Sequence, residues 1–372
     1  MHLLLQVLLL TAFISWSEGV HKIEKSDDYD LFHKPAVKPL LVNASLNLRN
    51  IIRISEREQT ISLEITLRMF WRDERVSLTM DKDYPSLPRD PTHYNLRYMV
   101  ETGDNIKQFW MPDLFVDEAI QMRDPYYKLP TESLRVYEDS TIRFSNRLNF
   151  DVACHMDFKQ YPVDQQYCIV KFESFSYTEE DILFHWLEDS LMISNPDIHL
   201  PHYTYNMYTD KEYKTDYYNQ SYPGLELKIH LIRKLNYHIV QTFLPSILYV
   251  CIAYFSILIP NENMFVVVRT GMVMFTLLTL TSLTNRVRSE VPDVSDLTYM
   301  DLWLISCLIF IFSCMVIIVT SAVLNRKGRQ ALSSKIEFWM KVLYPTFFLM
   351  LCVFYWSLLL AIYFQSMSLV ST

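Results

Sequence analysis

The sequence is poor in glycine, which occurs at 5 of 372 positions. It lacks the glycine-rich patterns that hold phosphate groups, and it contains no HExxH pair and no paired CxxC, which are typical of metal sites. The ten histidines are scattered, and the net charge of −8 excludes a strongly basic nucleic-acid-binding protein. From these absences we expect no enzymatic activity, no metal site, no cofactor and no nucleic-acid partner.

Cysteine is scarce as well, and of the 6 cysteines only Cys154 and Cys168 precede residue 251. The chain begins with an apolar stretch that ends near Ile14 and is too short to cross a bilayer, so residues 1–19 are predicted to form a signal peptide. The rest of the chain then enters an oxidising compartment, where a disulfide between Cys154 and Cys168 can persist. The alternative is a pair of free buried thiols, which is the role expected of the later cysteines.

Long hydrophobic runs are absent from residues 20–236, where polar and apolar residues alternate instead. The segment 61–67 places Ile and Leu at every second position, and the segment 225–231 does the same. This period of two predicts half-buried strands, and many such strands separated by turns predict an immunoglobulin-like β-sandwich. The charged residues 21–35 are expected to form a short leading helix. Two Asn-x-Ser triplets, at Asn43 and Asn219, are predicted glycosylation sites and suit a domain on the luminal side.

Four apolar stretches follow within residues 237–366, and each is about long enough to cross the hydrocarbon layer as a helix. They lie near residues 239–259, 264–284, 300–324 and 343–364. The short segment 325–342 is basic, which predicts that it faces the cytoplasm. The predicted class is therefore a β + α membrane protein, with an extracellular β-sandwich followed by a transmembrane four-helix bundle. Both termini are expected outside the cell, in the plasma membrane.

Several segments give the sequence a resemblance to a known family. The stretch between Cys154 and Cys168 has an aromatic-Pro-x-Asp tip, and further landmarks are Trp71–Asp73, Trp110–Phe115, Phe172–Tyr177 and Asp181–Trp186. Together they resemble Cys-loop pentameric ligand-gated ion channel subunits. The Glu-Ser-aromatic-x-Tyr-Thr run from Glu173 is similar to the glycine, GABA and glutamate-gated chloride channel branch.

The resemblance implies a homo- or hetero-pentamer with related subunits, gated by a small-molecule neurotransmitter and conducting chloride, at a synapse or in a neuron. One alternative is a cation-conducting or non-conducting auxiliary subunit of the same family, gated by acetylcholine or a biogenic amine. A four-span adhesion or scaffold protein is a second alternative, and it would leave these motifs unexplained.

The resemblance also implies a ligand site between adjacent subunits. The matching residues of the principal face are Phe115, Glu173, Phe175, Tyr177, Tyr217 and Tyr222, and those of the complementary face are Arg68, Ser145 and Arg147. Aromatic rings attract an ammonium group, and the planar fork of an arginine suits a carboxylate, so an amino acid such as GABA is the expected ligand. An amine would need the aromatic rings but not Arg68. The 211–224 loop lacks the cysteines of some relatives, and a glycan at Asn219 would crowd its entrance.

The second apolar stretch matches the pore helix of the family. Leu278 falls at the hydrophobic gate and Arg269 at the charged cytoplasmic end, while helical spacing puts Gly271, Phe275, Leu278, Ser282 and Asn285 on one face. No glutamate adjoins Arg269, and Arg286 and Arg288 add positive charge near the extracellular mouth, which favours chloride. Phe275 would narrow the lumen unless it points at a neighbouring helix or the subunit conducts only alongside others.

Coupling between ligand site and pore is expected at the membrane face of the extracellular domain. The matching residues are Tyr161, Pro162, Asp164, Arg233 and Pro292, together with Glu56 and Glu58. Arg233 is predicted to pair with Asp164 or with Glu56.

Overall fold

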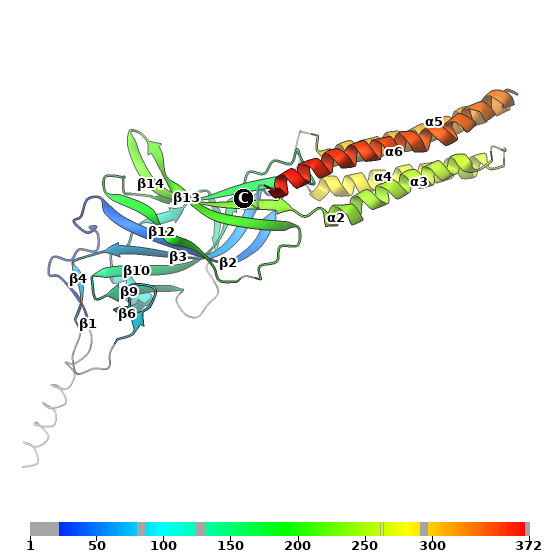
Figure 1. Cartoon of the computed structure of the whole chain (residues 1–372). Coiled ribbons are helices and arrows are strands. Elements are labelled where there is room, and N and C mark those ends of the chain that lie inside the picture. Colours follow the sequence, from blue (N-terminus) through cyan, green and yellow to red (C-terminus); the bar gives the residue numbers. More distant parts are fainter. Residues whose placement is uncertain are drawn as a thin grey trace, which may run out of the picture.

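The chain forms an elongated molecule with strands at one end and four long helices at the other (Figure 1). The computed structural model describes residues 22–79, 87–123, 131–195, 197–260, 262, 264–290 and 297–368. The predicted signal peptide, residues 1–19, lies outside the described residues, as does Pro292.

The larger sheet forms one face of the extracellular half. Its strands run in the order β12-β2-β3-β10-β9-β6-β5, with β8 paired to β10, and β12 is parallel to β2. The strands are β2 (Leu40–Ser55), β3 (Thr60–Arg72), β5 (Arg89–Asp90), β6 (Leu96–Thr102), β8 (Ala119–Arg123), β9 (Glu132–Tyr137), β10 (Thr141–Ala153) and β12 (Ile182–Ile193). In β3 the apolar residues Ile61, Leu63 and Ile65 are fully buried, as the alternation predicts. On the opposite face Glu64 is only partly buried, but Ser62 and Thr66 are buried as well, so the strand is more covered than a half-buried strand.

The smaller sheet has the order β13-β14-β11-β7. Its strands are β13 (Tyr203–Tyr217), β14 (Gln220–Arg233), β11 (Gln165–Ser174) and β7 (Leu114–Val116). The apolar residues of segment 225–231 are buried with those of β3 in one core between the sheets, so the predicted sandwich is confirmed.

The expected helix at residues 21–35 is wrong. Residues Lys22–Lys25 form strand β1, which pairs with β4 (Val76–Thr79). Ile23 packs against the core from this strand, and the pairing supplies the backbone hydrogen bonds that a short isolated helix would lack. A 3₁₀-helix, η1 (Gly103–Gln108), follows β6.

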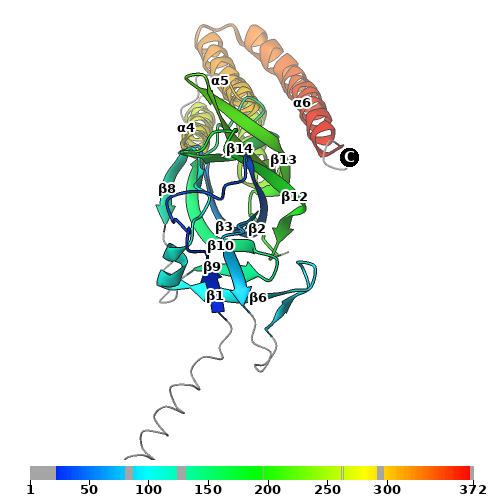
Figure 2. The same ribbon diagram turned by 90° about the vertical axis from the view of Figure 1, so that its left-hand side faces the viewer.

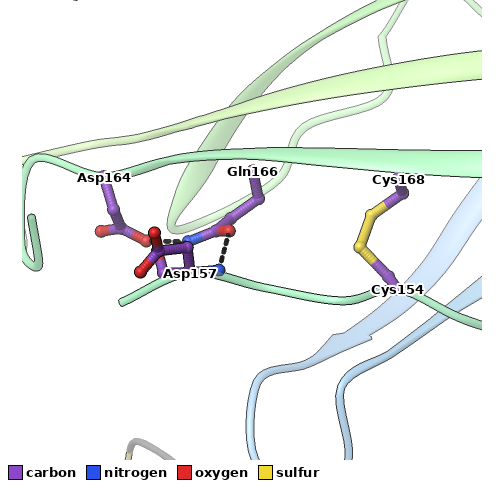
Figure 3. Close-up of a disulfide and its surroundings, with 5 residues drawn as sticks. All are labelled: Cys154, Asp157, Asp164, Gln166 and Cys168. Atoms are coloured by element: carbon purple, nitrogen blue, oxygen red, sulfur yellow. Dashed lines mark hydrogen bonds between the residues drawn. A yellow bond between two sulfur atoms is a disulfide. The ribbon is translucent and has the colours of Figure 1, made fainter. Parts of the chain in front are cut away.

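The disulfide between Cys154 and Cys168 is present, and the expectation of free thiols there is excluded. It joins the end of β10 in the larger sheet to β11 in the smaller sheet (Figure 3). Inside the loop, the Gln166 amide donates to the Asp157 carbonyl at 2.8 Å and to Asp164 Oδ2 at 2.5 Å. These bonds fix the loop tip in one shape at the membrane end of the sandwich.

The helical half contains four helices long and apolar enough to cross a membrane. The first is α2 (Asn236–His238), the π-helical turn η2 (Ile239–Phe243) and α3 (Leu244–Leu258), and it is followed by α4 (Val266–Glu290), α5 (Tyr299–Arg326) and α6 (Gln330–Ser368). Helix α6 occupies most of the expected loop 325–342, which leaves three residues between α5 and α6. Helix α6 then returns toward the sandwich along the outside of the bundle (Figures 1 and 2).

The helices pack in a defined order. Helix α4 contacts α3 and α5, and α6 contacts α5 and α3, so α4 and α6 lie on opposite sides of the α3–α5 pair. Trp303 of α5 is fully buried and donates from Nε1 to Ser246 Oγ of α3 at 2.8 Å, which fixes these two central helices together. This order leaves one face of α4 uncovered by the rest of the subunit.

Candidate functional site

Exposed aromatic side chains gather at one end of the smaller sheet. Phe115 of β7 and Phe175, just after β11, meet edge to face with ring centroids 5.9 Å apart. Tyr217 and Tyr222 make the same kind of contact at 5.9 Å across the β13–β14 turn. Phe175 is 77% exposed, so this end of the sheet offers ring surface that nothing in the subunit covers.

A buried carboxylate lies beneath these rings. Glu173 is 4% exposed, and its Oε2 accepts hydrogen bonds from the Tyr213 and Thr215 hydroxyls, each at 2.9 Å. Neither donor was among the residues expected from the sequence. The signal for them is the period of two in β13, which puts residues 213, 215 and 217 on one face.

Glycine at position 224 makes the Tyr213 bond possible. Gly224 of β14 pairs with Tyr213 on one side and with Glu173 on the other, so Tyr213 must cross β14 to reach the carboxylate. A Cβ at Gly224 would lie 2.4 Å from Tyr213 Cε1 and 2.7 Å from the Phe172 carbonyl oxygen. Only glycine leaves room for the tyrosine ring at this crossing.

The Glu173 carboxylate raises the pKa of two neighbouring tyrosines. Burial, followed by the hydrogen bond to Glu173, raises the pKa of Tyr213 above its usual range. The charge of Glu173 is also the main cause of a raised pKa at the exposed Tyr217. Glu173 therefore places negative charge below the aromatic rings, where a ligand ammonium group would be stabilised.

Tyr177 is directed inward. Its hydroxyl accepts a hydrogen bond from Trp110 Nε1 at 3.2 Å, and the two rings pack edge to face. Tyr177 therefore ties this end of the sheet to the core through Trp110. The exposed aromatic surface consists of Phe115, Phe175 and Tyr217, with Tyr222 partly buried beside Tyr217.

The candidate complementary face lies on the outer side of the larger sheet. Arg68 of β3 stands directly opposite Ser145 of β10, so the two side chains share one face. Within the part of the chain that the structure describes, Arg68 forms no hydrogen bond or ion pair, and the buried Ser145 hydroxyl also has no partner. Arg147, two residues further along β10, donates from Nε to Glu64 Oε1 at 2.8 Å.

The neighbouring Arg135 and Arg143 are already paired with Asp90. Arg135 and Arg143 donate to Asp90 Oδ2 from Nη1 at 3.0 and 2.9 Å, and the Thr92 hydroxyl donates to Oδ1 at 2.6 Å. Burial by itself would raise the pKa of Asp90, but these hydrogen bonds and the arginine charge lower it to about 2. Burial and the nearby arginines in turn lower the pKa of Arg68. Unlike Arg135 and Arg143, Arg68 is thus left available to an added anion.

Arg233, at the membrane end of β14, pairs with both of its predicted partners, Asp164 and Glu56. Arg233 is 3% exposed, donates from Nε and Nη2 to Asp164 at 2.6 and 3.1 Å, and donates from Nη1 to Glu56 Oε1 at 2.7 Å. Burial by itself would lower the pKa of Arg233, but the charges of Asp164 and Glu56 raise it well above its usual value. Glu58 instead pairs with Arg53 at the surface.

The Cys-loop tip touches the helices directly. The Tyr161 carbonyl accepts a hydrogen bond from the Met300 amide of α5 at 3.1 Å, and its hydroxyl lies 3.4 Å from His238 Nδ1 of α2. The Tyr161 ring also covers the Arg233 guanidinium at 4.7 Å, and Pro162 beside it is buried. A polar cavity of about 360 Å³ adjoins this contact. Sandwich and bundle are therefore joined at the loop tip.

The uncovered face of α4 carries the residues expected to line a pore. Gly271, Phe275, Leu278, Ser282 and Asn285 are all exposed in the subunit, as helical spacing predicts. Phe275 and Leu278 are 64% and 65% exposed, so Phe275 does not pack against another helix of the same subunit.

Arg269 requires a correction. The structure contradicts its expected place in the pore, because its side chain is fully buried and donates to the Ser256 carbonyl at 2.9 Å and to Glu337 Oε1 at 3.0 Å. Arg269 precedes Gly271 by two residues, which places it roughly 200° around the helix from that face. The helical spacing used for the pore face therefore already excluded it.

The two predicted glycosylation sites differ in setting. Asn219 is exposed at the β13–β14 turn with a φ of 68°, a left-handed conformation that asparagine tolerates. Asn43 lies within β2, half-buried, between β12 and β3. Modification of either residue stays a prediction.

The sandwich and the bundle each match a known domain. The ligand-binding domain of neurotransmitter-gated ion channels matches residues 20–235, and the transmembrane region of the same channels matches residues 242–353. The chain belongs to the neurotransmitter-gated ion-channel family. It is therefore a multi-pass membrane protein with an extracellular N-terminal domain.

Among individual proteins, the chain is 30% identical over 292 residues to a gamma-aminobutyric acid receptor subunit beta from Lymnaea stagnalis. The alignment covers 77% of this chain and 57% of that relative, so the chain spans little more than half of the relative's length. The resemblance to the anion-channel branch of the family is confirmed.

Proposed function

We propose that the chain is a subunit of a pentameric channel that an amino acid of the GABA type opens to chloride. The observation that carries the proposal is the unpaired Arg68 beside the unpaired Ser145 hydroxyl. A half-buried guanidinium without a counter-charge is costly, and a ligand carboxylate would supply the charge and accept both donors. The similarity to a gamma-aminobutyric acid receptor subunit supports the same ligand class.

The ammonium group of such a ligand would bind at the smaller sheet. An ammonium group over Phe175 and Tyr217 gains about 0.5–2 kcal/mol from the ring faces, and Glu173 adds a negative charge below them. Within one subunit Arg68 and Glu173 lie on different sheets. A ring of subunits that sets the larger sheet of one copy against the smaller sheet of the next would place both ends of a zwitterion in one site.

The charge of the exposed face of α4 supports selectivity for chloride. The exposed stripe of α4 from Gly271 to Asn285 contains no acidic side chain. At its outer end Arg286 lies beside Glu290 at 3.9 Å, and Arg288 lies 3.3 Å from Asp301 of α5. The side chains of Arg286 and Arg288 are 62% and 60% exposed, and cations at this end of α4 favour anions.

Two-electrode voltage clamp of the chain, expressed alone and with related subunits, tests the proposal. We expect GABA to open a current that reverses at the chloride potential, and we expect Arg68→Ala to raise the half-maximal GABA concentration by about 10-fold to 100-fold, since a charge-assisted hydrogen bond contributes about 1.5–3 kcal/mol. Arg72→Ala is the matched control, because Arg72 lies on the same strand with 69% of its side chain exposed. A current that follows sodium, or an Arg68→Ala channel as sensitive as Arg72→Ala, would contradict the proposal.

A second candidate is a subunit that conducts only together with others. It is favoured by Phe275, whose ring stands on the uncovered stripe one helical turn from Leu278. Surface-expressed chain that gives no current alone, and a GABA current of altered conductance with a partner subunit, would identify this function.

A further inference from the structure

Four helices contribute to a hydrogen-bonded group around Arg269, which lies in the first turn of α4. The start of α4 and the turn between α5 and α6 lie at the end of the bundle farthest from the β-sandwich (Figure 1). Arg269 of α4 donates from Nε to the Ser256 carbonyl of α3 and from Nη1 to Glu337 Oε1 of α6. The same Glu337 oxygen accepts a hydrogen bond from Ser321 Oγ of α5 at 2.7 Å, and Ser333 Oγ of α6 lies 2.6 Å from Ser321 Oγ. These five residues are called the Arg269 clasp below.

The clasp connects helices that otherwise hardly touch. Helices α4 and α6 lie on opposite sides of the α3–α5 pair. The Arg269 side chain passes through the bundle to reach Glu337, and both residues are buried, at 0% and 8% exposure. Charges buried to this extent must be paired, because water does not reach them to solvate them.

We propose that the Arg269 clasp is a positioning unit that fixes the inner end of the pore helix to the outermost helix, α6, and that Arg269 takes no part in selecting ions. The proposal rests on the proposed channel function for its electrical consequences, but the ion pair itself does not. The charge of Arg269 is neutralised by Glu337 inside the subunit, and its side chain is turned away from the face of α4 that carries Gly271. Arg269 therefore acts through the orientation of α4.

The geometry gives the clasp a role in opening. A rotation or tilt of α4 that changes the pore must either carry α6 along or break the Arg269–Glu337 pair. One guanidinium nitrogen, Nη2, is buried without a partner in the described residues, so the clasp is not fully satisfied in this arrangement. Glu337, which lies far from the pore stripe, therefore biases the equilibrium between closed and open channels.

A double-mutant cycle tests the clasp without reference to function. The full chain is made as wild type, Arg269→Gln, Glu337→Gln and the double variant, with Lys335→Gln as the control for loss of one exposed charge from α6. We expect each single variant to lower the melting temperature of the detergent-purified protein by several degrees and the double variant to lose little more than either single one, because each change alone leaves its partner unpaired. The clasp would be refuted if the losses in melting temperature of the two single variants add up in the double variant. It would also be refuted if each single variant melts like Lys335→Gln.

Voltage clamp with GABA then tests the positioning role. We expect Glu337→Gln to shift the half-maximal GABA concentration by about tenfold at equal surface expression, while the reversal potential stays that of the wild type in all four proteins. The exchanged pair Arg269→Glu with Glu337→Arg is expected to restore part of the wild-type response. A reversal potential that moves whenever Arg269 is replaced would overturn the exclusion of Arg269 from selectivity. Wild-type protein that gives no current either alone or together with related subunits would count against the proposed function, and the melting cycle would still decide the clasp.

Discussion

Replacement of Gly224 by alanine is the sharpest local perturbation the ligand end of the molecule offers. The added Cβ would lie 2.4 and 2.6 Å from two atoms of the Tyr213 ring and 2.7 Å from the Phe172 carbonyl oxygen. The ring must leave, which breaks its bond to Glu173, and the β11 backbone must also shift.

The two costs can be estimated separately. Loss of a hydrogen bond to a charged group costs about 1.5–3 kcal/mol, and forcing an extra carbon into a packed site costs about 1–3 kcal/mol. Together they predict that Gly224→Ala lowers the free energy of unfolding by roughly 2.5–6 kcal/mol, which for a domain of this size is a fall of roughly 5–24 °C in melting temperature. We also expect weaker GABA binding, because Glu173 loses one of its two donors.

Thermal unfolding and GABA binding of the purified protein measure both effects. Tyr213→Phe removes the hydroxyl alone and is expected to show only the first cost. Gly271→Ala is the matched glycine control, since no atom lies within 4 Å of its added Cβ and alanine is the better helix former. If Gly224→Ala melts and binds like the wild type, the argument that Tyr213 needs the space over Gly224 is refuted.

Three further predictions concern other parts of the chain. Arg233→Ala leaves the buried Asp164 without its cation, so we expect agonist currents to be abolished while GABA binding persists; lost surface expression would show a folding role instead. The low pKa of Asp90, about 2, implies that its contribution of about 2 kcal/mol is present above about pH 4 and is lost as the pH falls toward 2, so Asp90→Asn should flatten this part of the acid-unfolding curve. Phe275→Thr should raise single-channel conductance if the ring faces the lumen, and an unchanged conductance would place it at a subunit contact.

Much of the fold follows from hydrophobic period. Strands such as 61–67 and 225–231 could be predicted because apolar and polar residues alternate in them, which indicates the face that is buried. The helix expected at residues 21–35 failed because charge alone does not distinguish a helix from an edge strand that pairs with β4.

In helix α4 the hydrophobic period of the sequence does not show which face is buried. Apolar residues lie on both faces of α4, with Val273 and Leu280 buried and Phe275 and Leu278 exposed. Sequence spacing groups residues into faces, but only the packing of α3 and α5 decides which face is inside. The partner of Arg269 lies 68 residues further along the chain, on a helix that spacing within α4 does not reach.

The candidate ligand site was predicted from resemblance, whereas the residues that support it in the structure were not predicted. Glu173 was expected, whereas Tyr213, Thr215 and Gly224 became visible only once the register of β11, β14 and β13 was known. The Asp90 group is a similar case, because it gathers residues from β5, β9 and β10 that no local pattern connects.

Strand β14 links the ligand end to the membrane end. It carries Gly224 beneath Tyr213 and, nine residues later and ~30 Å away at the usual rise of a strand, Arg233. The residues between them are buried except Glu226 and Lys228, so the strand is held rigidly along this length.

From Arg233 the contacts continue into the bundle without a gap. Arg233 binds the loop tip, the tip carbonyl of Tyr161 accepts from Met300, and the adjacent Asp301 lies 3.3 Å from Arg288 of α4. The pore helix is thus held to α5 at its outer end and by Arg269 to the other three helices at its inner end. These contacts form a continuous physical route from Tyr213 along β14 to both ends of α4.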